Sequence, residues 1–143
     1  MFLKRWLAPT VLVLLPLLTG TVIYWFSDRN FLFLNWFSVF CSDIQCREAR
    51  VSLAPAMLVD YVPDGCWAFA LASFLALLWL NPQSRISRVV LLGALAGMSY
   101  EVGQGLGFFP GTVSFIDLVV GMLAGIAGAM LGWKWKGFSE MKS

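Results

Sequence analysis

Long runs of apolar residues, separated by shorter polar connections, organise this chain. Four runs are long enough to cross the hydrocarbon core of a bilayer, which takes roughly 20 helical residues. They cover residues 7–26, 62–80, 86–106 and 113–133. None has the alternation of apolar and polar residues that is typical of a membrane β-strand. The pattern predicts an all-α, polytopic membrane protein, with a single membrane domain that forms a four-transmembrane-helix bundle.

Two prolines fall within the first predicted helix. Pro9 lies in the first turn, where the missing N–H costs little, whereas Pro16 lies mid-helix and should kink it. Kinks of this kind are tolerated in lipid when neighbouring helices satisfy the freed carbonyl group.

Composition supports lipid as the solvent. Hydrophobic residues make up 59% of the chain and charged residues 13%, against roughly 25% charged residues in soluble domains. A water-soluble fold of this size could not hide so much apolar surface. The net charge of +2 is too small to indicate a nucleic-acid partner.

The placement of Lys and Arg predicts the orientation. Basic residues flank the first span, fill the second connection and follow the last span, at Lys4, Arg5, Arg85, Arg88, Lys134, Lys136 and Lys142. These regions alternate so that they share one side, which the positive-inside rule makes cytoplasmic. We therefore expect a multi-pass protein of the plasma membrane with both termini in the cytoplasm.

The first outer loop, residues 27–61, is more than a plain connection. Its segment 30–40 is rich in aromatic residues and too short to span, which favours an interfacial or re-entrant segment with Trp36 at headgroup depth. The alternative is a lid that packs on the outer ends of the helices.

Three cysteines, Cys41, Cys46 and Cys66, lie in or near the predicted outer half. An oxidising exterior would permit a disulfide between Cys41 and Cys46, although all three could equally be reduced, buried thiols. The chain has no histidine and no CxxC pair, so we expect no metal site. No cofactor motif is present either.

The last two helices carry the most specific pattern. Residues spaced four, eight or eleven apart share a helix face, and one face of each helix combines glycines with a carboxylate at its outer end. The glycines on these faces are Gly93, Gly97, Gly121, Gly125, Gly128 and Gly132. Such spacing lets two backbones approach closely in lipid, so we expect the third and fourth helices to pack through these faces.

That packing predicts an outward-facing polar pocket. Glu101 and Asp117 should lie at matching depths, and the second helix enters from the same side with Asp64 near its start. With Gln104, these residues should converge beneath the outer surface and bind a ligand, because intramembrane acids usually face a bundle interior or a cavity. The alternative is structural, in which they bond across helices or cap helix starts.

These residues resemble the VanZ-like family of small membrane proteins over residues 60–132. The resemblance lies in Glu101-Val-Gly-Gln104, in Pro110-Gly111, in Asp117 before a glycine-rich helix, and in Asp64 after Pro63. It implies a cell-envelope role in a bacterial plasma (inner) membrane, with resistance to a glycopeptide antibiotic, teicoplanin, as the family's named association. The family's basic partners are replaced here, so only Asp64, Glu101, Gln104 and Asp117 carry over.

Three functions remain open from the sequence. The first is a cell-envelope protein whose pocket binds a membrane lipid, a lipid-linked glycan or an amphiphilic antibiotic. The second is a non-catalytic subunit or assembly factor of a larger membrane complex, with a membrane-protein partner or a second copy of itself. The third is an enzyme acting on a lipid-linked substrate with two carboxylates as acid and base, although no nucleophile motif accompanies them.

Overall fold

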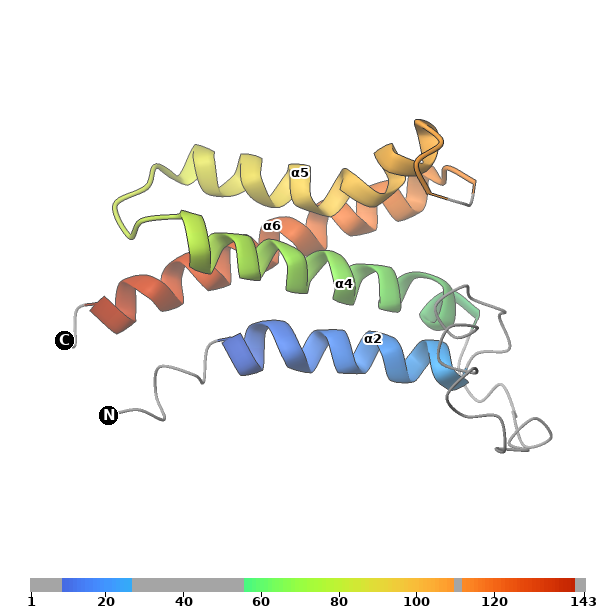
Figure 1. The fold of residues 1–143 in the computed structure, drawn as a ribbon, viewed down its shortest axis with the longest axis horizontal. Coiled ribbons are helices and arrows are strands. Elements are labelled where there is room, and N and C mark those ends of the chain that lie inside the picture. The colour runs from blue at the N-terminus through green and yellow to red at the C-terminus, as the bar shows by residue number, and fades with distance from the viewer. Residues whose placement is uncertain (1–8, 27–55, 110–111, 141–143) are drawn as a thin grey trace.

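The protein is a helix bundle in which helices that follow one another along the chain run antiparallel, while α4 and α6 pack side by side in the same direction (Figure 1). The computed structural model describes residues 9–26, 56–109 and 112–140. The elements are η1, Thr10–Leu14; α2, Leu15–Phe26; α4, Ala56–Trp79; α5, Ile86–Gly105; and α6, Phe115–Glu140. The start of α2, the α4–α5 connection and the end of α6 lie at one end of the bundle, and the α5–α6 connection lies at the other (Figure 1). The all-helical fold is thus confirmed for the described residues.

In the described part of the chain, three helices are long and apolar enough to cross a membrane. These spans are Tyr61–Trp79, Ile86–Gly105 and Phe115–Ser139, whereas the first apolar helix, Thr10–Ile23, is shorter. Large apolar side chains point away from the bundle, among them Leu18, Trp79 and Leu95. Water would disfavour so much exposed apolar surface, whereas lipid does not. The helices therefore agree with a multi-pass membrane protein.

The first helix accommodates Pro16 by a change of helix type. Pro16 has no N–H to donate to the preceding turn. The residues ahead of it form the π-helical turn η1, in which the N–H of Leu15 donates to the carbonyl of Thr10. A π-turn inserts one extra residue and is a recognised cause of helix bending. The predicted disturbance at Pro16 thus takes the form of a widened turn just before it.

The second spanning helix begins earlier than the sequence predicted. α4 starts at Ala56, so that Pro63 lies inside the helix and is fully buried. The expectation that Pro63 and Asp64 open this helix was wrong, because a proline in lipid need not end a helix when packing holds both sides of it. Asp64 therefore lies about two turns inside α4 rather than near its start.

The last helix is longer than predicted, extending beyond residue 133 to Glu140. Two side chains tie its final part to the end of α4. The indole Nε1 of Trp133 donates to the carbonyl of Asn81 at 3.0 Å, and the Nζ of Lys136 donates to the carbonyl of Leu77 at 3.1 Å. The second bond satisfies one of the carbonyls that the end of α4 leaves without an intrahelical partner.

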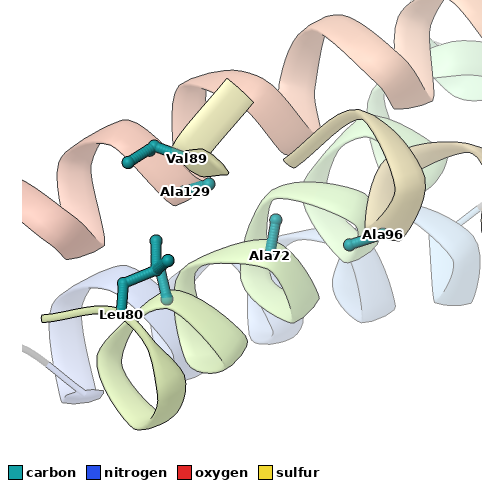
Figure 2. Packing of buried hydrophobic residues seen from close by; sticks show 6 residues of the cluster. Ala72, Leu80, Val89, Ala96 and Ala129 are labelled. Carbon is teal, nitrogen blue, oxygen red and sulfur yellow. The ribbon is translucent and has the colours of Figure 1, made fainter. Parts of the chain in front are cut away.

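Small residues fill the core between α4, α5 and α6 (Figure 2). Its buried members are Ala72, Ala76, Leu80, Val89, Ala96 and Ala129. Four of the six are alanines, so the helix axes can approach closely and the bundle is held by contact between backbones rather than by large side chains.

Glycines bring α5 and α6 closest together. A Cβ atom added to Gly93 would lie 2.7 Å from the carbonyl oxygen of Gly125, and one added to Gly121 would lie 2.5 Å from that of Gly97. No real side chain fits at such distances, so only glycine permits this approach.

Gly128 and Gly132 serve a different neighbour. The sequence placed them on the stripe facing α5, but in the structure they face α4, where a Cβ at Gly132 would lie 2.9 Å from the carbonyl oxygen of Ser73. The reason is that α6 has different closest neighbours along its length. The first half of α6 lies closest to α5, and the second half of α6 lies closest to α4. One glycine stripe therefore packs against two helices.

Candidate functional site

The chain reverses direction after α5 through a glycine-dependent turn. Gly107 has φ +77°, in the left-handed region that favours glycine. Its N–H donates to the carbonyl of Gln104 at 3.0 Å, and the N–H of Phe108 donates to that of Gly103 at 2.8 Å. This pair of bonds is the Schellman motif that commonly ends helices.

Phe109 then folds back over the end of α5. Its ring stacks on that of Tyr100, with centroids 5.3 Å apart. A Cβ atom at Gly103 would lie 2.5 Å from the Cδ2 atom of Phe109, so the absent side chain makes room for the ring. The connection is thus packed against the outer end of α5.

The start of α6 is capped by two residues that come from different places in the sequence. The hydroxyl Oγ of Ser114 accepts the N–H of Asp117 at 3.3 Å, as an N-cap residue does. The N–H of Ser114 in turn donates to Oε2 of Glu101 at 3.0 Å. In a capping box the acid at the third helical position accepts that N–H. Here Glu101, reaching across from α5, takes its place.

Because Glu101 accepts the N–H of Ser114, the Asp117 carboxylate does not serve as the capping acceptor. Its Oδ1 atom is buried and has no hydrogen-bond partner within the described part of the chain. Glu101, by contrast, is 6% exposed and engaged with Ser114. Both acids lie at the amino-terminal end of α6, whose dipole favours negative charge. A buried carboxylate oxygen without a donor is the kind of atom that a ligand donor would complete.

The register of the glycine contacts sets these acids opposite one another. Gly93 lies against Gly125, and Gly97 against Gly121. Because α5 and α6 are antiparallel, a further step of four residues along each helix brings Glu101 opposite Asp117.

The other two predicted site residues lie at different depths. Gln104 is half-buried on α5, one turn further out than Glu101. Asp64 lies within about one turn of the level of Asp117, since a Cβ at the next residue, Gly65, would lie 3.4 Å from a methyl carbon of Val120, three residues after Asp117 in α6. Although α4 begins at Ala56, its membrane-length part is Tyr61–Trp79, so that Asp64 is the fourth residue of its span and Asp117 the third of Phe115–Ser139.

Sequence reasoning missed Ser114, Phe109 and Lys136. The pattern Ser114-Phe-Ile-Asp117 is a capping signal, but the helix was predicted to begin with the apolar run at Val113, two residues before its observed start at Phe115. Lys136 was read only as a flanking charge, and nothing in the sequence indicated its bond to Leu77. The contact of Phe109 with α5 depends on the turn and has no local signal.

The remaining predicted features lie mostly outside the described residues. This holds for Cys41, Cys46 and segment 30–40. Cys66 is a free thiol and half-buried. Among the described residues, no group of three or more His, Cys, Asp or Glu side chains is arranged to hold a metal ion.

A separate apolar groove, with a volume of about 470 Å³, runs along the first helix. Its lining consists of Thr10, Val11, Leu14, Leu15, Leu18, Thr19, Val22 and Ile23. None of the predicted site residues borders it, and its character is that of a lipid-facing surface.

Comparison with known proteins finds no matching family model, curated protein or solved structure. The class of the protein therefore comes from the fold itself. Over the residues that the structure describes, it is all-helical, with three membrane-length helices and a polar site where α5 meets α6.

Proposed function

We propose that the protein spans a bacterial plasma membrane four times, with α2 and the residues before it as the first span and both termini in the cytoplasm. The distribution of charge supports this orientation. Arg85, Arg88 and Lys134 are exposed at the end of the bundle that holds the start of α2 and the end of α6, whereas Glu101 lies near the opposite end. Basic residues mark the cytoplasmic side, so the Glu101–Ser114 end faces outward.

We further propose that this outward end binds the polar part of an amphiphile: a membrane lipid, a lipid-linked glycan or an amphiphilic antibiotic. The observation that carries the proposal is the buried Oδ1 of Asp117, which has no hydrogen-bond partner among the residues described and lies beside the Glu101–Ser114 bond. An amine or hydroxyl donor would satisfy that oxygen. Ammonium headgroups, sugars and glycopeptides all offer such donors, while their apolar parts could remain in the membrane.

The resemblance to the VanZ-like family supports the same proposal. Glu101, Gln104 and Asp117 belong to the motif, and a glycopeptide-resistance role would place the ligand at the outer surface. Asp64 belongs to the same motif and lies on the neighbouring helix α4.

Substitution of Asp117 by Asn tests the proposal. The change keeps the shape of the side chain and removes its charge. Binding of phosphatidylethanolamine, a lipid-linked disaccharide and teicoplanin should be measured separately with the full chain in nanodiscs. We expect binding of at least one probe to fall about tenfold or more, as a charged hydrogen bond is worth about 1.5–3 kcal/mol.

The matched control is Ser99→Ala, which removes an exposed hydroxyl that bonds only the Ala96 carbonyl of its own helix. It should leave binding unchanged. The proposal is wrong if wild type binds none of the three probes, or if Asp117→Asn binds them as wild type does while melting at the same temperature. A stable heteromeric complex after mild extraction would instead favour the subunit hypothesis.

A further inference from the structure

Exposed basic side chains gather at the end of the bundle opposite the acids. Arg85 and Arg88 lie at the start of α5, and Lys134 lies near the end of α6. The end of α6 is tied to the connection that leads to Arg85, since the indole of Trp133 donates to the carbonyl of Asn81 just after α4. Three cationic groups from two helices therefore project around one connection.

The backbone adds to this positive charge. Arg85 is the N-cap residue of α5, its side chain makes no capping bond, and the first turn of α5 holds no acidic residue. The first N–H groups of a helix have no intrahelical acceptor and carry the positive end of the dipole. Ser87, in the same turn, is exposed and offers a hydroxyl. Such a helix start attracts phosphate groups, and here two arginines accompany it.

Apolar side chains flank the same end. Trp79, the last residue of α4, is 71% exposed, Ile86 is 52% exposed and Phe138 is 62% exposed. Tryptophan at a helix end is typical of the level of the lipid headgroups. A ligand here would meet cations and N–H groups on one side and apolar surface on the other.

We infer that Arg85, Ser87, Arg88 and Lys134 form a surface that binds the phosphate headgroup of an anionic phospholipid, with its chains beside Trp79 and Ile86. Lys136 is not part of this basic surface, because its Nζ is bonded to the carbonyl of Leu77. The inference requires only that the helices cross the membrane. It is independent of any ligand at the Glu101–Ser114 end.

Spin-labelled lipids and the full chain in phosphatidylcholine vesicles test this inference. The measured quantity is the association of labelled phosphatidylglycerol relative to labelled phosphatidylcholine. Wild type should prefer phosphatidylglycerol, and Arg85→Gln/Arg88→Gln should reduce that preference at least about fivefold, the effect expected of a single basic residue at a charged membrane surface. The control Arg85→Lys/Arg88→Lys keeps both charges and should retain most of the preference.

Equal preference in wild type and the glutamine variant, or no preference in wild type, would overturn the inference. If the glutamine variant proves unstable, two other tests replace it: the Lys134→Gln variant, and wild type in 1 M salt. At that salt concentration the Debye length is about 3 Å, so interactions between exposed charges are screened. A preference for phosphatidylglycerol that persists both in Lys134→Gln and in 1 M salt would contradict the inference. Displacement of the lipid by millimolar inorganic phosphate alone would show a free-anion site and would also overturn it.

Discussion

Gly97 offers the sharpest test of how α5 and α6 are held together. Its replacement by alanine would direct a methyl group at the backbone of Gly121, with the Cβ only 2.6 Å from the carbonyl carbon and also in contact with the carbonyl oxygen. Neither atom belongs to a flexible side chain, so the helices themselves must move. Gly105, also on α5, provides the matched control, since a Cβ there meets nothing closer than a methyl carbon of Val113 at 3.4 Å.

The size of the effect follows from these distances. Raising the 2.6 Å contact to an ordinary 3.4 Å separates the helices by about 0.8 Å, and overpacking of this kind costs about 1–3 kcal/mol. Gly105→Ala should instead be neutral or stabilising by up to about 1 kcal/mol, because alanine favours a helix over glycine. The two identical substitutions are therefore expected to have opposite signs or very different sizes.

Unfolding in mixed detergent micelles, followed by helical circular dichroism, measures both variants on one scale. Gly97→Ala should unfold at a lower fraction of denaturing detergent than wild type, and Gly105→Ala should not. If Gly97→Ala were as stable as wild type, the close contact of α5 with α6 would not exist, and the register that sets Glu101 opposite Asp117 would lose its basis.

Three further predictions concern the ends of the helices, each measured by the same unfolding assay. Glu101→Ala should lower the free energy of unfolding by about 1–3 kcal/mol, because it leaves the Ser114 amide without its acceptor. Glu101→Gln should lower it less, because the amide oxygen of glutamine can still accept. Equal losses of stability in the two variants would show that the charge matters and the hydrogen bond does not. Gly107→Ala should cost about 1 kcal/mol through its φ of +77° alone, since no atom lies within 4 Å of the added Cβ, and a stabilised variant would contradict the turn. Lys136→Met should lower stability by about 1–3 kcal/mol, because it removes the hydrogen bond to the Leu77 carbonyl at the end of α4. Lys134→Met, which changes an exposed side chain, should not lower it. Similar losses from both variants would argue against a stabilising role for the Lys136–Leu77 bond.

The spanning helices were predictable because lipid requires long apolar runs, and the runs ending near residues 80 and 106 agree closely with the ends of α4 and α5. The boundaries that failed depend on tertiary contact. Pro63 continues inside α4 because it is buried against neighbours, and α6 continues because Trp133 and Lys136 bond to residues more than fifty positions away. Hydropathy holds no information about either.

Part of the candidate site could likewise be predicted from the sequence, and part depends on tertiary contacts. Glycine spacing predicted that the third and fourth helices pack through these faces, as Gly97 and Gly121 do, and counting residues from the helix ends predicted matching levels for Glu101 and Asp117. It could not reveal that Glu101 accepts the N–H of Ser114, because that bond depends on how the chain returns after Gly107. The start of α4 at Ala56 was missed, although its membrane-length part, Tyr61–Trp79, agrees closely with the predicted run.

Hydrogen exchange at the Ser114 amide tests the central claim most directly, namely that packing of α5 on α6 brings the Glu101 carboxylate onto the start of α6. We predict a protected amide in wild type, with protection lost in Glu101→Ala, largely lost in Gly97→Ala and unchanged in Gly105→Ala, because a separation of about 0.8 Å would stretch the 3.0 Å bond to about 3.8 Å, beyond hydrogen-bonding distance. A Ser114 amide that exchanges freely in wild type, or that stays protected in Glu101→Ala, would contradict the account.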